Sequence, residues 1–230
     1  MGKTATPTPP SRLRSLAPGD PRLALPLYTL SEAARYLKLP SSTLHYWARP
    51  SQNEPLVTTF GTRGGAPTMP FIGFAEAFVV KAARDAGVPN HRIRPGVEAI
   101  KRRAGGIPHA LASRLVYTDG AALLLAELDD GDLDEAHTDQ RQFRKAVESQ
   151  LKLISWADDG FASRLRLPQF EKAQVVVDPG VASGHPLLRR GAGVRVKDLV
   201  DSVRAGDSAH DVARGFGVPV KEVQEILREA

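Results

Sequence analysis

The stretch that most constrains the fold is Tyr28–Arg49, YTLSEAARYLKLPSSTLHYWAR. Thr29 or Ser31 can cap a first helix, and Glu32 falls in its opening turn, where the helix dipole favours a carboxylate. Leu39-Pro40 ends this helix, because proline pushes the residue before it out of the α region. The apolar residues recur at helical spacing and form a short buried face: Ala33, Ala34 and Leu37.

A second helix is predicted over Thr43–Ala48, capped by Ser41 or Ser42 and ended by Arg49-Pro50. Its two large apolar side chains are expected to face inward: Leu44 and Trp47. The outward side chains can hydrogen-bond to phosphates or base edges: Ser42, Thr43, His45, Tyr46 and Arg49. Two short helices joined by a tight turn form the unit that places its second helix in the DNA major groove. The same pattern also occurs in many small α-domains.

The sequence TLSEAARYLKLPSSTLHYW resembles the opening helices of MerR-type winged helix-turn-helix domains. In those domains a wing follows the recognition helix. Here Leu56–Met69 contains the β-prone run Val57–Phe60 and then the glycine-containing turn Gly61–Gly65, as a two-stranded wing would. The resemblance implies DNA binding, with Arg63 at the wing tip meeting a phosphate or the minor groove.

Composition sets only broad limits. The chain has 230 residues, enough for one large domain or two small ones, and is 42% hydrophobic and 25% charged, as in soluble globular proteins. A net charge of +5 suits a nucleic-acid binder but supports solubility equally well.

The absence of cysteine excludes disulfides, thiolate zinc sites and cysteine nucleophiles. No apolar run approaches the roughly 20 residues of a membrane span, and no signal peptide is recognisable, so a cytoplasmic location is expected.

Residues 1–20 are rich in Pro, Thr, Ser and Arg and predict a disordered arm. Arg12 and Arg14 in this arm could touch DNA or be merely solvated. Two helices are predicted after the wing, over Pro70–Gly87 and His91–Ala104. The basic residues between them and within them could follow a DNA backbone, although a solvated helix face explains them as well: Lys81, Arg84, Arg92, Arg94, Lys101, Arg102 and Arg103.

The run from Met69 to Leu128 resembles the central part of the large VapB-type antitoxins. Those proteins carry a MerR-like helix-turn-helix at the N-terminus and a smaller C-terminal domain. The matching features are an aromatic-rich helix containing Glu76, a Gly-Val-Pro break, an Ile-Arg step into a helix, and Thr118-Asp119-Gly120 before an apolar strand. From the residues alone, Val116-Tyr117 and Ala121–Leu125 predict a hairpin that turns at Asp119-Gly120.

The next segments predict a linker, a helix and short strands. Glu127–Asp139 is acidic without Lys or Arg, which favours a solvated linker; its spacing does not match a calcium loop. Gln140–Ala157 is amphipathic at helical spacing and could pack on the core or form a subunit interface. Ser163–Val177 contains apolar runs that predict short strands.

The segment from Val175 to the end resembles the small C-terminal domain of the same antitoxins. It shares the Val177-Asp178-Pro179 turn and the Gly184-His185-Pro186 step. The family usually has Gly-Thr-Arg where this chain has Gly191-Ala192-Gly193, so the role of that Thr and Arg does not carry over, and only Arg195 lies near enough to substitute.

Helical spacing in this segment predicts three helices with apolar faces: Val196, Leu199, Val200 and Val203; Val212, Ala213 and Phe216; Val220, Val223, Ile226 and Leu227. This is again a helix-turn-helix shape. The last helix is expected to expose Lys221, Glu222, Glu225 and Glu229, and these carboxylates would repel phosphates. A structural or partner-binding role is therefore favoured over a second DNA-reading unit.

No catalytic or metal-binding constellation is recognisable, because the six histidines are scattered and no phosphate-binding loop or nucleophile elbow is present. The prediction is a mainly α (α+β) protein without a cofactor. Its expected parts are a disordered arm (1–20), a winged helix-turn-helix domain (21–126), an acidic linker (127–139), a connecting helix and strand (140–170) and a trihelical C-terminal domain (171–230).

The resemblance implies the antitoxin of a type II toxin–antitoxin system. Such a protein binds its own promoter, as a homodimer on a palindromic site, and silences a PIN-domain ribonuclease toxin. A PIN active site holds Mg²⁺ in an acidic pocket, which an antitoxin arginine can plug; the candidates are Arg204, Arg214 and Arg228. The alternative is a MerR-like regulator that answers a small ligand without a toxin partner. A third possibility is an interaction protein whose helix-turn-helix is only architectural.

Overall fold

The computed structural model describes residues 15–50, 54–61, 66–116, 145–189 and 193–229. The first part of the chain forms α1 (Pro21–Ala24), α2 (Leu30–Tyr36), α3 (Ser41–Ala48), α4 (Phe71–Asp85), α5 (Asn90–Arg103) and the 3-10 turn η1 (Ala110–Ala112). A sheet follows, made of β1 (Ile154–Trp156), β2 (Ala162–Arg166), β3 (Val175–Val177) and β4 (Leu187–Leu188), with the 3-10 turn η3 (Ala182–Gly184) before β4. The chain ends in α8 (Val196–Arg204), α9 (Ala209–Phe216) and α10 (Val220–Glu229).

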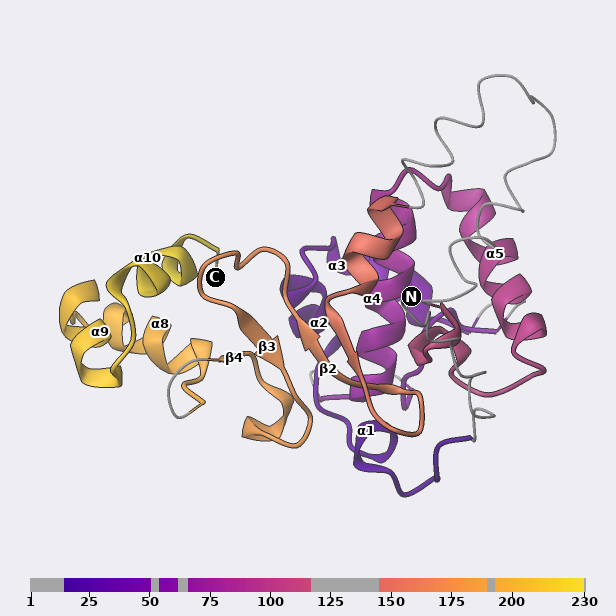
Figure 1. Ribbon diagram of the computed structural model, residues 1–230, viewed down its shortest axis with the longest axis horizontal. Helices are drawn as coiled ribbons and strands as arrows, with labels where there is room; N and C mark the ends of the chain where they lie inside the picture. The colour runs from indigo at the N-terminus through magenta and orange to yellow at the C-terminus, as the bar shows by residue number, and fades with distance from the viewer. Residues whose placement is uncertain (1–14, 51–53, 62–65, 117–144, 190–192, 230) are drawn as a thin grey trace, which may run out of the picture.

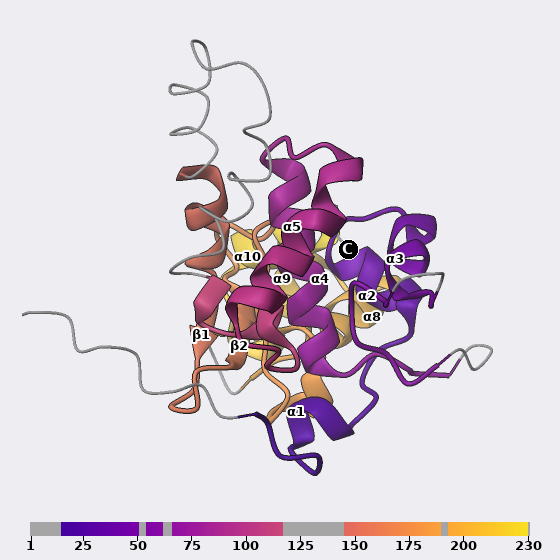
Figure 2. The ribbon, with the colours of Figure 1, turned by 90° about the vertical axis from the view of Figure 1, so that its right-hand side faces the viewer.

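The predicted mainly α (α+β) class is confirmed. Figure 1 shows α8, α9 and α10 gathered at one end of the molecule and α2–α5 at the other, with the sheet between them. Figure 2 shows α4 passing through the middle of the N-terminal helices, with α5 beside it. No helix in the described part of the chain is long and apolar enough to cross a membrane.

The first helix of the predicted helix-turn-helix, α2, is set by local signals. Thr29 and Glu32 form a capping box: the Thr29 Oγ1 accepts from the Glu32 amide at 3.1 Å, and the Glu32 carboxylate accepts from the Thr29 amide at 2.9 Å. The helix ends at Tyr36 with Leu37 as its C-cap; Lys38 follows with a φ of +52°, and the Leu39 amide donates back to the Ala34 carbonyl at 2.8 Å. Thr29 is therefore the cap, and Ser31 is not.

The second helix, α3, begins two residues earlier than predicted. Pro40 occupies its N-cap position, and no described side chain caps it, so the predicted capping by Ser41 or Ser42 is wrong. Pro40 has a φ of −57°, which already matches the helix, so the first turn extends back to the proline and both serines become helical.

The core is built around α4. Nearly every side chain from Phe71 to Val80 is buried, because this helix is covered on several sides by α1, α5, η1 and β2. Leu44 and Trp47 of α3 are also buried, as predicted. Burying an aromatic or large aliphatic side chain contributes about 1.5–3 kcal/mol, so the buried side chains of α4 contribute strongly to the stability of this core.

The segment predicted to be a wing is only partly described. The Phe60 amide donates to the Thr68 carbonyl at 2.8 Å, and Met69 pairs in an antiparallel bridge with Tyr28. Between them lies the predicted tip, residues 62–65 with Arg63, which is outside the described residues. The described residues before the tip, 54–61, contain no β-strand, so the strand predicted over Val57–Phe60 is wrong. This segment crosses α4 at Gly73, where an added Cβ would stand 2.1 Å from the Thr58 carbonyl oxygen.

The sheet is antiparallel, with the strands in the order β1-β2-β3-β4. Ile154 pairs with Leu165, Leu165 with Val177, and Val176 with Leu187. The strands predicted in Ser163–Val177 are confirmed as β2 and β3. The continuous helix predicted over Gln140–Ala157 is wrong, because its described part is helical only over 145–151 and then becomes β1. Pairing with β2 outweighs the helical pattern there.

The three predicted C-terminal helices are confirmed as α8, α9 and α10. The predicted exposure of Glu222 and Glu225 on α10 is wrong, since each residue is only 6% exposed. The Glu225 carboxylate accepts hydrogen bonds of 2.7–3.2 Å from three consecutive backbone amides, those of Glu171, Lys172 and Ala173. A carboxylate satisfied in this way is well accommodated inside the protein.

Several predicted segments lie outside the described residues: most of the N-terminal arm, with Arg12 and Arg14; the Asp119-Gly120 hairpin apart from Val116; the acidic linker at 127–139; and residues 191 and 192.

Polar contacts fasten the N-terminal helices to the rest of the chain. The Tyr28 hydroxyl donates to the Gly184 carbonyl, the Gln169 amide group donates to the Tyr36 carbonyl at 2.9 Å, and the Lys38 ammonium donates to the Glu229 carbonyl at 2.7 Å. The helix-turn-helix is thus bound to segments that lie more than a hundred residues later in the sequence.

Candidate DNA-binding surface

The exposed face of α3 carries three of the side chains predicted to touch DNA. Tyr46 is 65% exposed, Ser42 is exposed and Thr43 is half-buried, while Leu44 and Trp47 hold the opposite face of the helix in the core. Because the buried face is fixed by packing, the hydroxyls of Ser42, Thr43 and Tyr46 project from a rigid support. Such a support is what base or phosphate recognition requires.

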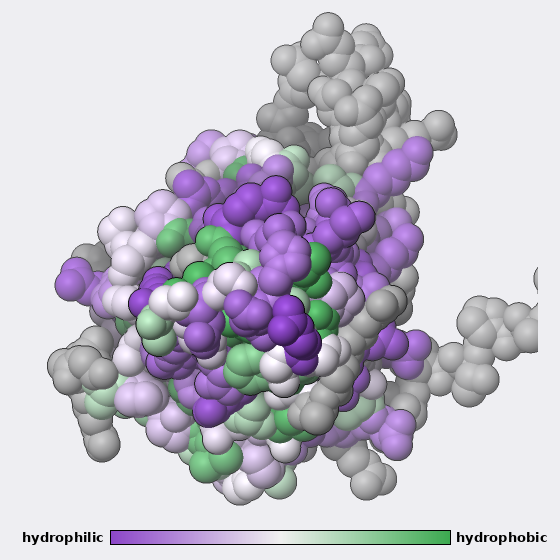
Figure 3. Space-filling model, turned by 90° about the vertical axis from the view of Figure 1, so that its left-hand side faces the viewer, coloured by the Kyte–Doolittle hydropathy of each residue, from purple (hydrophilic) through white to green (hydrophobic). Residues whose placement is uncertain are grey.

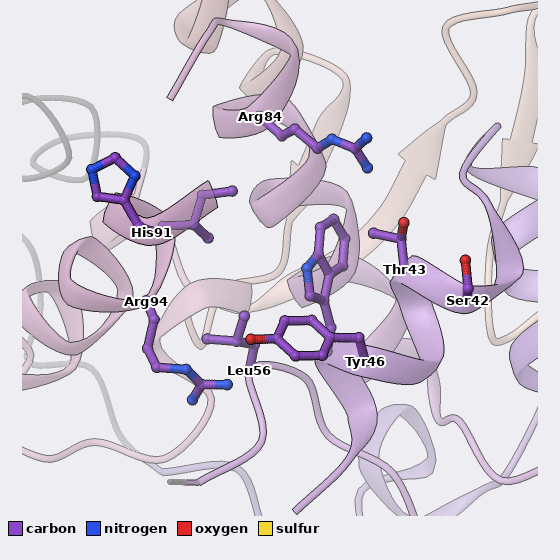
Figure 4. A pocket seen from close by; sticks show the side chains of 9 residues that line it. Ser42, Thr43, Tyr46, Leu56, Arg84, His91 and Arg94 are labelled. Carbon is purple, nitrogen blue, oxygen red and sulfur yellow. The ribbon is translucent and has the colours of Figure 1, made fainter. Parts of the chain in front are cut away.

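These three side chains open onto a hollow of about 450 Å³ (Figure 4). Its other described lining residues are Trp47, Leu56, Arg84, His91, Ile93 and Arg94. Arg84 stands in the last turn of α4, and His91 and Arg94 stand near the start of α5. No carboxylate is among the described residues that line the hollow, so its charged groups favour an anion.

The remaining predicted DNA contacts lie elsewhere. His45 is turned back onto its own helix, where its Nδ1 donates to the Ser41 carbonyl at 2.8 Å. Arg49 is exposed at the C-cap of α3 but does not line the hollow. Arg63 is outside the described residues. The structure therefore brings Ser42, Thr43 and Tyr46 together in one place and leaves His45 and Arg49 beside it.

The sequence did not indicate that three residues of α4 and α5 lie beside α3: Arg84, His91 and Arg94. Their only signal in the sequence was the excess of basic residues between Lys81 and Arg103. Contact between the α4–α5 corner and α3 depends on how the helices pack, which that excess does not encode. A hydrogen bond to the backbone holds the Arg94 side chain, whose Nη1 donates to the Glu54 carbonyl at 2.7 Å.

The three arginines considered for toxin binding stand on three different helices. Arg204 lines a groove of about 330 Å³ between α2 and α8, whereas Arg214 and Arg228 are exposed on α9 and α10 outside it. Arg214 lies 3.4 Å from Asp211 on its own helix. Figure 3 shows the end of the molecule formed by the C-terminal helices, where mostly hydrophilic side chains surround small apolar patches. A protein partner could contact such a surface, but the structure does not gather the arginines into one plug.

A charged cluster ties the N-terminal segment to the sheet. The Arg22 guanidinium bonds to Asp20 at 2.7 Å and also to Asp159 in the turn after β1. The hydrogen bond from Arg22 holds the pKa of Asp20 below its usual value. At Asp159 burial works in the opposite direction, but hydrogen bonds from Arg22 and from the Phe161 amide outweigh it, so that pKa is lowered too. Both carboxylates are therefore held in the charged form.

No group of three or more His, Asp or Glu side chains that could hold a metal ion occurs in the described ranges.

Comparison with known proteins agrees with this geometry. Residues 26–97 match a family described as "Putative DNA-binding HTH domain", and residues 175–230 match one described as "Protein of unknown function (DUF433)". A Mycobacterium tuberculosis protein named "Putative antitoxin VapB45" is 40% identical over 228 residues, covering 90% of this chain and 94% of the relative. The crystal structure of Rv2018 from Mycobacterium tuberculosis is also 40% identical, with a TM-score of 0.73, over 88% of this chain and 97% of that one. The chain therefore belongs to the family of VapB-type antitoxins.

Proposed function

We propose that this protein is the antitoxin of a type II toxin–antitoxin pair that represses its own operon through α3 and neutralises a PIN-domain ribonuclease. One observation carries the DNA part of the proposal. The hydroxyls of Ser42, Thr43 and Tyr46 lie on the solvent-facing side of α3, at a hollow that Arg84 and Arg94 also line and that no described carboxylate lines. The family relationship carries the toxin part.

In the proposed complex α3 enters the major groove. Tyr46 and Ser42 face base edges or phosphates, and the segment after Phe60 lies over the neighbouring backbone. A homodimer would place two copies of α3 on half-sites about 34 Å apart, so the operator should be a palindrome with that spacing.

The toxin is proposed to dock on the C-terminal helices. A PIN-domain ribonuclease has an acidic pocket for Mg²⁺, and an arginine in that pocket would compete with the metal and with the RNA phosphate. Arg204, Arg214 and Arg228 are the proposed candidates. Because they stand on three different helices, only one of them is expected to enter the pocket.

DNA binding is tested by fluorescence anisotropy with the duplex upstream of the gene. Tyr46→Ala and Arg49→Ala should each weaken binding about tenfold, since one contact to a base or a phosphate is worth roughly 1–3 kcal/mol. The exposed Val181, which lies away from α3, supplies the control Val181→Ala. If Tyr46→Ala and Arg49→Ala bind like the control, the proposed surface is wrong.

Toxin binding is tested by co-expression of the tagged chain with the protein encoded by the adjacent gene, followed by pull-down and a ribonuclease assay. A silent ribonuclease in the complex supports the proposal. Arg204→Gln, Arg214→Gln and Arg228→Gln then identify the inhibiting side chain, with Arg114→Gln as an exposed control outside these helices. A neighbour that does not bind would favour the ligand-responsive regulator instead.

A further inference from the structure

We infer that the corner between α4 and α5 is a phosphate clamp, in which Arg84 and Arg94 hold a DNA backbone phosphate beside α3. The clamp rests on the proposed DNA-binding function, and it adds an element that lies outside the two helices of the helix-turn-helix. It would anchor the DNA independently of sequence, while α3 reads the bases.

The two arginines approach α3 from different elements. Figure 4 shows Arg84 on the side of the hollow near Thr43 and Arg94 on the side near Tyr46. A phosphate in the hollow would thus lie between two guanidinium groups and next to hydroxyl donors. Arginine presents five N–H donors in a planar fork that matches phosphate oxygens, so this set is suited to a phosphodiester.

Arg94 is already oriented. Its Nη1 donates to the Glu54 carbonyl at 2.7 Å, in the segment just after α3, and this bond uses only one of the five donors. The guanidinium therefore loses less freedom when a phosphate binds than an unrestrained side chain would. The same bond couples the position of α5 to the segment that leads from α3 to the wing.

The helix ends at the hollow reinforce the positive charge. Ser42 and Thr43 belong to the first turn of α3, and His91 and Arg94 stand near the start of α5. Both helices have a proline at the N-cap and no side-chain cap among the described residues, so no side chain occupies the first-turn amides. The positive ends of two helix dipoles thus open onto the hollow that both arginines line, and helix N-termini with arginines favour a bound phosphate.

Neighbouring charges do not cancel this effect. Two acidic residues adjoin the hollow in the sequence, and both are paired with lysines: Asp85, next to Arg84, pairs with Lys81, and the Glu54 carboxylate pairs with Lys101. Arg84 and Arg94 are therefore left to face the hollow. A clamp of this kind fixes the register of the duplex and makes binding depend strongly on salt.

The test is a series of anisotropy titrations of the full chain at several salt concentrations, with the upstream duplex and with a scrambled duplex of equal length. Arg84→Gln and Arg94→Gln should each weaken binding to both duplexes about tenfold. Each should also reduce the slope of log K against log salt by about 0.9, the value for one phosphate contact. The ratio of the two affinities should not change.

Two variants serve as controls. Arg166→Gln removes an exposed arginine on β2 and should leave affinity and slope unchanged. Arg94→Lys keeps the charge and should keep the slope, which separates loss of a phosphate contact from local misfolding.

The outcomes are distinguishable. If the parent protein binds DNA and both Arg→Gln variants keep its slope of log K against log salt, the clamp is wrong, while the DNA-binding proposal stands. Weakening confined to the upstream duplex also overturns the clamp, because the arginines would then read bases. If the parent protein binds neither duplex, the DNA-binding proposal fails and the clamp fails with it.

Discussion

The Tyr28 hydroxyl donates a hydrogen bond of 2.6 Å to the Gly184 carbonyl, across 156 positions of sequence. Tyr28 is fully buried, and its burial raises the pKa of the phenol, so the hydroxyl remains a donor at neutral pH. Gly184 has a φ of +72°, and the two residues before it, Ala182 and Ser183, also lie in the left-handed region, at +50° and +51°. A strained turn thus presents the carbonyl that locks the start of the helix-turn-helix to the C-terminal part.

Tyr28→Phe should lower the free energy of unfolding by about 1–3 kcal/mol, because it leaves the buried Gly184 carbonyl without its donor. Urea denaturation followed by circular dichroism measures this change. Tyr46→Phe removes a hydroxyl from a residue that is 65% exposed and should change stability by less than about 0.5 kcal/mol. Equal effects of the two substitutions would show that the Tyr28 bond contributes nothing specific.

Gly73→Ala should displace the segment Leu56–Phe60, which crosses α4 at this glycine. The added Cβ would stand 2.1 Å from the Thr58 carbonyl oxygen, so the segment from Leu56 to Phe60 must move away from α4. We expect a loss of about 1–3 kcal/mol in stability and weaker DNA binding in anisotropy titrations.

The matched control for that substitution is Gly215→Ala in α9, where nothing lies within 4 Å of the added Cβ. It should stabilise the protein by up to about 1 kcal/mol, because alanine is the better helix former. A Gly73→Ala variant as stable as this control would contradict the close crossing of Thr58 over α4.

Glu225→Gln tests the buried carboxylate of α10. The substitution removes the charge and replaces one acceptor oxygen by a donor that faces backbone amides, so it should cost about 2–3 kcal/mol in the free energy of unfolding. Glu171→Gln, which changes an exposed carboxylate in the adjoining turn, should cost almost nothing. Thermal denaturation of both variants distinguishes these expectations, and a small effect at Glu225 would mean that the three amide bonds are dispensable.

The Arg22 cluster should make stability depend on pH in the acid range. The folded-state pKa values of Asp20 and Asp159 lie below the ordinary value of 3.8. Their contribution is therefore complete above about pH 4 and is lost as the pH falls through the lowered values. Arg22→Gln should cost about 1 kcal/mol at pH 7, as expected for a partly exposed cluster, and the difference from the parent protein should shrink below pH 4.

Urea denaturation of the two proteins at pH 7, 5, 4 and 3 measures this difference. Arg166→Gln, which alters an exposed arginine on β2, should show no such dependence. A gap between Arg22→Gln and the parent protein that stays constant down to pH 3 would rule out the carboxylates as its source.

Much of the helix-turn-helix was readable from the residues alone. The sequence placed the start of the first helix at Thr29 or Ser31 and its end before Pro40, because caps and stops act through bonds between residues a few positions apart; the structure then selected Thr29. The apolar faces of α8, α9 and α10 were also predicted, because helical spacing of apolar residues is visible along the chain. The same spacing predicted that Leu44 and Trp47 of α3 are buried.

Other features were decided only by tertiary contact. Ile154–Trp156 fits a helical pattern but becomes a strand because β2 lies beside it, and Glu225 is buried because three amides from a distant turn satisfy its carboxylate. Arg84 and Arg94 join Tyr46 at one hollow because of how α4 and α5 pack against α3. Local sequence determined the helices of the helix-turn-helix and of the C-terminal end, together with their main apolar positions, since those properties depend on neighbours along the chain. The residues that contact those apolar faces and charged side chains lie far away in the sequence, and only the packing of the folded chain brings them into contact.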